Sequence, residues 1–293
     1  MLKEFALEPE ALASWESFRY LVEKFGVSQG RVISRFPKQW KRLVYEAAQK
    51  ALSGTSQLSK IEVKLNALGD DVVFPTARPG GDGSKPWIER ALVEHAREPF
   101  AGIIARANPR NQAHVLLHSD LDEQDPRFHS SSQMEIERTA ANLVGCATFL
   151  LRHTTTVKWV DHVMDLRQPR WRRPFCEALS VLARVGRPVH FELHRRFGNE
   201  IEKRNLRQQY EEAFSRYRVD SVTLALYLHA EQFMHDRFIL TERGGIQIGH
   251  GLDDNEDGGS APTANVTLLE PSIFQVQWKK YSDEGSLVMK FGP

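Results

Sequence analysis

The sequence has few cysteines, no long apolar run and almost no net charge, and each shortage excludes a class of protein. Only Cys146 and Cys176 are present among 293 residues, so neither a disulfide framework nor a cysteine-based zinc site is expected. The formal charge of +1 means that a site for a polyanion must be a local patch. No run approaches the roughly 18 apolar residues that cross a bilayer, and the first residues do not resemble a secretory signal. We therefore expect a cytoplasmic protein without a transmembrane segment.

The composition that remains is that of a globular protein. Hydrophobic residues make up 41% of the chain and charged residues 26%. This length accommodates one large domain or two small ones. The clearest linker-like stretch, residues 75–86, is rich in Gly, Pro and Asp.

The spacing of apolar residues in the first half predicts a helical region followed by a mixed segment. Helical spacing extends to about Leu52, whereas Ile61, Val63 and Leu65 alternate as in a short strand. Later elements are expected as a helix over 87–96, strands over 100–105 and 113–118, a loop over 120–132 and a helix over 134–151.

The second half alternates between strand and helix patterns, which predicts a sheet with helices packed on it. Residues 238–240 and 246–248 are short apolar runs, and Gly244-Gly245 between them suits a tight hairpin turn. The other elements are expected as strands over 156–160, 188–193, 221–228 and 265–269 and helices over 175–185, 200–217 and 273–281.

The hairpin begins with a group of residues suited to phosphate chemistry. His235 and Arg237 are two apart, so in an extended chain both side chains project from one face. An imidazole can attack phosphorus or move a proton, and a guanidinium grips phosphate oxygens with two hydrogen bonds. Glu242 is the candidate carboxylate to support one of them. The turn Gly249-His250-Gly251 would let backbone amides approach an anion.

These residues resemble the phospholipase D superfamily. That family carries His-x-Lys, four residues and Asp, followed by Gly-Ser-x-Asn on the next strand; here Arg237 stands in the Lys place and Glu242 in the Asp place. A nearer resemblance is to the phospholipase D-like domain at the C-terminus of MIT-domain proteins. Its signature reads His-Asp-Arg, a hairpin and Gly-Arg-Gly-Leu-Asp, and residues 235–237 and 249–253 follow it with His250 in the Arg place. The resemblance covers about residues 156–293, and residues 1–150 resemble no family that we can name.

The resemblance implies two alternative functions. In the enzymes, one His forms a phosphohistidine without a metal or other cofactor, and a His from a second motif copy protonates the leaving group. One copy is evident here, so catalysis would need a homodimer; His194-Arg195-Arg196 lacks the later carboxylate and glycine turn. In the MIT-associated branch, the domain is understood to bind anionic membrane lipid, and Arg237 and Glu242 favour that branch. The resemblance leaves open whether the chain is an enzyme.

A second basic segment lies just after the strand expected at 156–160. Residues 167–173 interleave arginines with Trp171, and Arg170, Arg172 and Arg173 are candidates for phosphate binding. The alternative is a solvated loop that leads into a helix, with Trp171 packed against the protein.

We therefore expect an α/β protein in which a helical region (1–60) and a mixed segment (61–150) precede a phospholipase D-like sheet flanked by helices (151–293). The expected function is recognition of a phosphodiester, with nucleic acid favoured over lipid. Proteins of similar fold include nucleases of prokaryotic defence systems, which makes a nuclease-like component of such a system one hypothesis. The alternative is an inactive module that binds anionic lipid or a protein partner, alone or within a larger complex.

Overall fold

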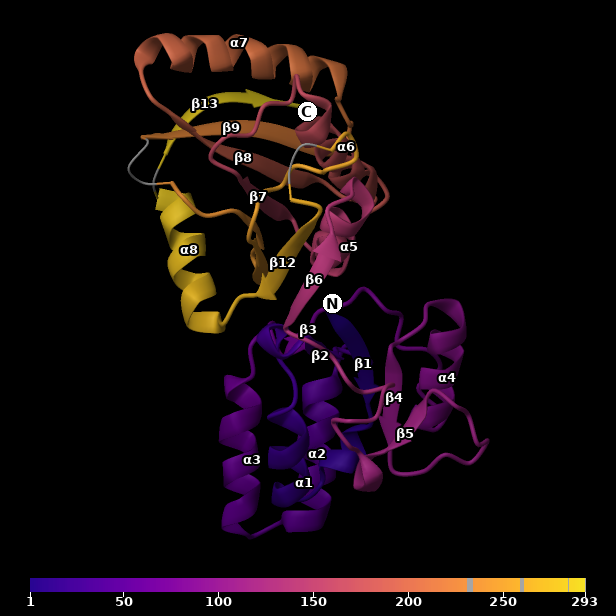
Figure 1. Cartoon of the computed structure of the whole chain (residues 1–293). Coiled ribbons are helices and arrows are strands. Elements are labelled where there is room, and N and C mark those ends of the chain that lie inside the picture. The colour runs from indigo at the N-terminus through magenta and orange to yellow at the C-terminus, as the bar shows by residue number, and fades with distance from the viewer. Residues whose placement is uncertain (231–233, 259–260, 284, 293) are drawn as a thin grey trace. The chain divides into compact units, whose positions relative to one another are not determined.

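The computed structural model describes residues 1–230, 234–258, 261–283 and 285–292 and divides the chain into two units (Figure 1). The amino-terminal unit is Leu2–Ser131, and the carboxyl-terminal unit is Ser132–Pro293 together with Met1. This division differs from the expected boundaries at 60 and 150. Strand β6 (Gln133–Glu137) pairs with β12 (Thr263–Leu268), which places residues 132–150 in the second unit.

The amino-terminal unit is built on a parallel sheet in the order β3-β2-β1-β4-β5. Its strands are β1 (Lys3–Leu7), β2 (Arg31–Ser34), β3 (Val73–Phe74), β4 (Gly102–Ala105) and β5 (Val115–Leu117). Its helices are α1 (Trp15–Val22), α2 (Trp40–Leu52), α3 (Ser56–Ala67) and α4 (Trp87–Arg97), with 3-10 turns η1 (Pro9–Leu12), η2 (Val27–Gln29) and η3 (His118–Asp120).

The prediction of a helical region over 1–60 is therefore right for α1, α2 and the start of α3 but misses β1 and β2, which lie within the sheet. A parallel strand is covered on both faces, so its sequence lacks the alternation that marks a half-exposed strand. The strand predicted around residues 61–65 is wrong. Ile61 and Leu65 lie one helical turn apart on α3 and are buried in the core of the unit, whereas Val63 is 70% exposed.

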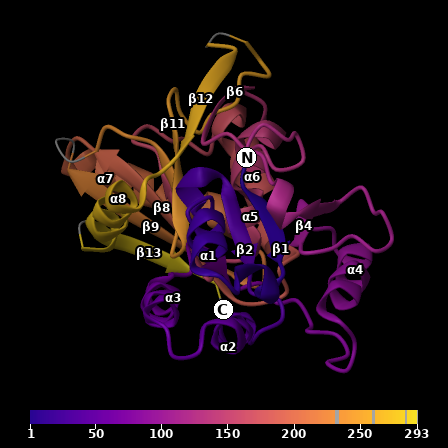
Figure 2. The ribbon, with the colours of Figure 1, turned by 90° about the horizontal axis from the view of Figure 1, so that it is seen from below.

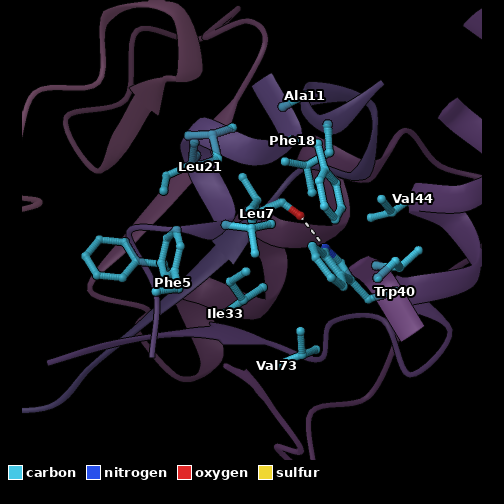
Figure 3. Packing of buried hydrophobic residues seen from close by; sticks show 14 of the residues in the cluster. Phe5, Leu7, Ala11, Phe18, Leu21, Ile33, Trp40, Val44 and Val73 are labelled. Atoms are coloured by element: carbon cyan, nitrogen blue, oxygen red, sulfur yellow. Dashed lines mark hydrogen bonds between the residues drawn. The ribbon is translucent and has the colours of Figure 1, made fainter. Parts of the chain in front are cut away.

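Two apolar clusters cover the two faces of this sheet. On one face, Phe5, Leu7 and Ile33 pack against α1, α2 and α3. Trp40 lies in this cluster, and its Nε1 donates a hydrogen bond to the Leu7 carbonyl oxygen at 2.7 Å (Figure 3). On the other face, Ala6, Ile103 and Val115 pack against α4, which Figure 2 shows apart from α1–α3.

The carboxyl-terminal unit is built on a mixed sheet of eight strands among the described residues, in the order β13-β9-β8-β7-β10-β11-β12-β6. Strands β7, β8 and β9 are parallel, and the remaining pairs are antiparallel. The strands not yet given are β7 (Thr156–Val160), β8 (Val189–Phe197), β9 (Val222–Ala230), β10 (Phe238–Thr241), β11 (Gly244–Ile248) and β13 (Ser286–Phe291). The helices are α5 (Ala140–Arg152), α6 (Pro169–Ala183), α7 (Glu200–Arg216) and α8 (Pro271–Asp283).

The helices of this unit lie on both faces of the sheet. Phe191 of β8 stacks on Phe175 of α6, whereas Lys158 of β7 reaches the backbone of α8. Figure 1 accordingly shows α7 and α8 on opposite sides of β7–β9. The α/β class, the alternation from β7 to β9 and the β10–β11 hairpin confirm the sequence predictions. The helix expected over 134–151 is wrong in its first part, which forms β6, and β13 was not expected.

No helix in the described part of the chain combines the length and apolar character needed to span a membrane.

Candidate functional site

Three loops of the carboxyl-terminal unit meet where β7 ends and β10 begins. Strand β10 runs antiparallel to β7 with Phe238 opposite Val160, so Arg237, the residue before Phe238, comes level with Asp161. Strand β8 runs parallel to β7 with His194 opposite Val160, so Arg196 comes level with His162. The loop after β11 starts beside them, because Ile248, the last residue of β11, donates a hydrogen bond from its amide to the Arg237 carbonyl oxygen at 3.1 Å.

Asp161 holds two of these loops in place. Its side chain is fully buried, with Oδ1 accepting from the Val163 amide at 3.0 Å and Oδ2 accepting from the Leu252 amide at 2.9 Å. A charged acceptor in a buried site makes strong hydrogen bonds to backbone amides. One carboxylate thereby fastens both the loop after β7 and the loop after β11.

Arg237 and His162 present two buried N–H groups at this point. Nη2 of Arg237 lies 3.4 Å from Nε2 of His162, and a guanidinium can only donate, so the imidazole nitrogen accepts. The proton of the neutral imidazole then resides on Nδ1. Both Nδ1 of His162 and Nε of Arg237 are buried without a hydrogen-bond partner among the described residues. Buried donors are rarely left unmatched, and the described residues leave others of this kind at Arg170, Trp171 and Arg195, so the pair is a candidate site for an acceptor rather than a unique one.

Burial and nearby positive charge favour the neutral form of His162. Burial lowers the pKa of His162, and the nearby charge of Arg237 lowers it further. Asp161 opposes this shift, whereas Arg196 and His235 add to it. His235 and Arg237 therefore both act on one imidazole, His235 from an exposed position and Arg237 from a half-buried one.

The turn at residues 249–251 was expected to offer backbone amides to an anion, but its main feature is the close approach of Gly251 to Arg237. At Gly251 the backbone has φ +133°, and an added Cβ would lie 2.6 Å from Oδ1 of Asp253 and 3.8 Å from Nε of Arg237. Only glycine fits this close approach. The Gly249 amide donates to the Asn265 carbonyl oxygen, and Gly249 and His250 are exposed. The structure thus leaves Gly251 next to Arg237 and ties the Gly249 amide to β12.

Glu242, expected to support His235 or Arg237, lies elsewhere. It stands at the hairpin turn and accepts hydrogen bonds from the amides of Thr155 and Thr156 at the start of β7. Five residues along an extended strand span roughly 16 Å and reverse the face of the sheet. The expectation that Glu242 serves the His235 site is therefore wrong.

The basic segment expected to be a phosphate-binding loop is the first turn of α6. Arg173 forms ion pairs with Asp254 and Asp257, and Arg170 lies 3.8 Å from Asp253. The Arg170 guanidinium also covers the ring of Trp171, which is 6% exposed. Arg172 donates to the carbonyl oxygen of residue 167 at 3.2 Å. The acidic loop after β11 thus compensates the charges of Arg170 and Arg173. Trp171 packs inward, as the alternative interpretation of this segment predicted.

Sequence reasoning missed three residues that build the site, namely Asp161, His162 and Arg138. The guanidinium of Arg138 is buried in an ion pair with Asp253, which fixes the Gly-Leu-Asp motif to the end of β6. One available signal was position. Asp161-His162 directly follows a strand in an alternating pattern, where α/β sheets place functional residues.

A separate polar cluster lies under α8 on the face of β7, β8 and β9. Nδ1 of His194 lies 2.9 Å from Nε2 of His229, and its Nε2 lies 3.1 Å from Glu192. Lys158 pairs with the same carboxylate and donates to the Tyr281 carbonyl oxygen. Burial lowers the pKa of His194 to about 4 and that of His229 to about 3. Among the described residues, no group of three or more His, Cys, Asp or Glu side chains is placed to hold a metal ion.

Comparison with known proteins identifies distant structural neighbours. No family model matches the chain, and a search of the curated proteins finds no match. Among solved structures, the phospholipase D family member Nuc from Salmonella typhimurium superposes with a TM-score of 0.36 at 9% identity, covering 55% of this chain and 99% of Nuc. The archaeal chromatin protein TrmBL2, whose structure shows a mode of DNA binding, gives a TM-score of 0.32 at 8% identity over 57% of each chain. At these values the functional conclusion rests on the geometry of the site.

Proposed function

We propose that the carboxyl-terminal unit is a phospholipase D-like module that binds the phosphodiester group of a nucleic acid. The observation that supports this most directly is the pair of buried, unmatched donors, Nε of Arg237 and Nδ1 of His162. Phosphate oxygens are strong acceptors, and charge-assisted hydrogen bonds to them are the strongest that side chains make.

The groups around this pair favour an anion. Burial and the charge of Arg237 lower the pKa of His162, with smaller contributions from Arg196 and His235, so the neutral imidazole can act as a donor while Arg237 supplies the charge. The exposed position of His235 suits contact with a long ligand that extends over the surface. The resemblance of residues 235–237 and 249–253 to the phospholipase D-like domain of MIT-domain proteins supports recognition of a phosphate group but points to anionic lipid as its source, so it does not favour nucleic acid.

Binding is the function that this geometry supports best. A phosphohistidine mechanism needs an imidazole that is oriented as a nucleophile, and Glu242, the carboxylate expected to help, serves the hairpin turn instead. Lipid is the competing source of phosphate. Nucleic acid is preferred because the binding groups extend from a half-buried arginine to an exposed histidine.

Binding of single-stranded DNA, RNA and anionic vesicles by the full chain tests the proposal. Arg237→Ala removes a charged donor worth about 1.5–3 kcal/mol, so we expect affinity for the nucleic acid to fall by roughly 10- to 150-fold. His162→Asn keeps an N–H donor and should weaken binding less. Arg207→Ala, which removes an exposed arginine on α7, is the matched control and should have little effect.

Three outcomes would contradict the proposal. The first is equal affinity in Arg237→Ala and Arg207→Ala, and the second is binding to vesicles alone. The third is cleavage of the nucleic acid in the presence of EDTA that is lost in His235→Ala, which would make the unit a phosphodiesterase.

A further inference from the structure

The amino-terminal unit has the strand order of a doubly wound sheet. From the central strand β1 the chain moves outward to β2 and β3, then returns through α4 to β4 and β5 on the other side. The direction of winding therefore reverses between β1 and β4. In open parallel sheets, ligands bind outside the carboxyl ends of the strands near such a reversal.

A pocket of about 370 Å³ opens at this carboxyl edge. One wall is a face of α1, the helix that follows β1, and the other is formed by η3 and the residue after it, which follow β5. The size falls within the usual range for small-molecule sites. Its lining residues are Glu16, Ser17, Tyr20, Leu21, His118, Ser119 and Leu121.

The pocket combines an apolar floor with hydrogen-bonding groups. Leu21 and Leu121 are buried, and Tyr20 is 46% exposed with its hydroxyl donating to the Leu121 carbonyl oxygen at 3.1 Å. Glu16 contributes an exposed carboxylate. Nδ1 of His118 is buried and has no hydrogen-bond partner among the described residues. A flat ring on Tyr20, with polar substituents toward Glu16 and His118, would match all of these groups.

The charge of the pocket argues against a phosphorylated ligand. None of its lining residues is a lysine or arginine, and Lys24, which lies over the Tyr20 ring, is held in an ion pair with Glu123. The connection from β1 to α1 contains no glycine or basic residue. The helix amide of Ser17 already donates to the Ser14 side chain. A phosphate-binding loop requires free amides and glycine, so this edge lacks the means to bind phosphate.

We propose that this pocket binds a nucleoside-like ligand, a flat heterocycle with hydroxyl or amino donors and no phosphate. The ring packs on Tyr20 above Leu21, and a hydroxyl or amino group donates to the Glu16 carboxylate. This site is independent of the phosphate-binding function assigned to the carboxyl-terminal unit.

Calorimetric titration of the full chain with adenosine, cytidine and AMP tests this inference. We expect a nucleoside to bind, and Glu16→Gln and Tyr20→Leu each to weaken it by about tenfold through loss of a charged acceptor or of the stacking ring. Both side chains are exposed, so circular dichroism should show an intact fold. Glu46→Gln, on the outer face of α2, is the matched control and should bind as the wild type does.

Repeating the titration with Arg237→Ala distinguishes this pocket from the phosphate site, because that variant should bind the nucleoside with unchanged affinity. The inference is overturned if neither nucleoside binds or if AMP binds far more tightly than adenosine. It is equally overturned if Glu16→Gln and Tyr20→Leu bind like the control, or if Arg237→Ala abolishes binding.

Discussion

Replacing Asp161 should loosen both loops that form the phosphate site. Its carboxylate is fully buried and accepts one backbone amide from each loop, at 3.0 Å from Val163 and 2.9 Å from Leu252. A buried amide that loses its acceptor costs about 1–3 kcal/mol, so Asp161→Ala should destabilise this region by about 2–6 kcal/mol. Asp161→Asn retains one acceptor oxygen and should cost about half as much. These costs are a large share of a typical unfolding free energy.

Hydrogen exchange followed by mass spectrometry measures the effect in the full chain. Peptides that cover Val163 and Leu252 should exchange faster in Asp161→Ala, by the factor that corresponds to the lost free energy. Peptides from β1 and β4 are the internal control, and Asp220→Ala, at a 98% exposed side chain, is the control variant. Unchanged exchange at both loops would refute the role of Asp161 as their common anchor.

Three further changes test other parts of the structure. The pKa values of His194 and His229, lowered to about 4 and about 3 from an ordinary 6.5, mean that the unfolded chain binds protons first. Stability of the carboxyl-terminal unit should therefore be full above about pH 6.5 and fall toward pH 4, and a urea midpoint that is equal at pH 7.5 and 5 would contradict this. Gly251→Ala should cost about 1–3 kcal/mol by strain at a positive φ and weaken binding of nucleic acid; unaltered affinity would separate the bend from the site. Arg78→Met leaves Glu4 buried without its cation, whereas Glu94 keeps Arg97, and should destabilise the amino-terminal unit by about 3–5 kcal/mol in urea titrations, without changing binding of nucleic acid.

The sequence predicted best where local pattern and tertiary environment agree. The segment from β7 to β9 and the β10–β11 hairpin were expected because apolar runs and helical spacing each indicate one structure. The turn itself is Glu242-Arg243, and Gly244-Gly245, expected to form it, pair with β10 within β11. In the first sheet, the strands predicted over 100–105 and 113–118 form β4 and β5, but the central strand β1 was missed for the opposite reason. Phe5, Ala6 and Leu7 are all fully buried, and a short apolar run of this kind is ambiguous between strand and helix.

The candidate site was predictable in part. Spacing indicated that His235 and Arg237 share a face of a strand. Strand β10 begins at Phe238, after both residues, so this stays a prediction; Arg237 contacts His162, whereas His235 is exposed. The same spacing also argued against Glu242. It lies an odd number of residues after both His235 and Arg237, and in an extended chain such residues point to opposite faces. Asp161 and His162 were not predicted, because their role depends on pairing between β7, β8 and β10, and the order of strands in a sheet is not written in local sequence. Arg170 and Arg173 were expected to be available for phosphate binding. Their pairing with the acidic loop is a tertiary contact, which the local sequence does not indicate.

The proposed function depends on two N–H groups that donate hydrogen bonds to a phosphate oxygen. Proton–nitrogen correlation spectra of the full chain, recorded while a short single-stranded oligonucleotide is added, observe these groups directly. We expect the resonances of Arg237 Nε and His162 Nδ1 to shift together and to saturate at the concentration that saturates binding. Saturated binding that leaves both resonances unchanged would contradict the account.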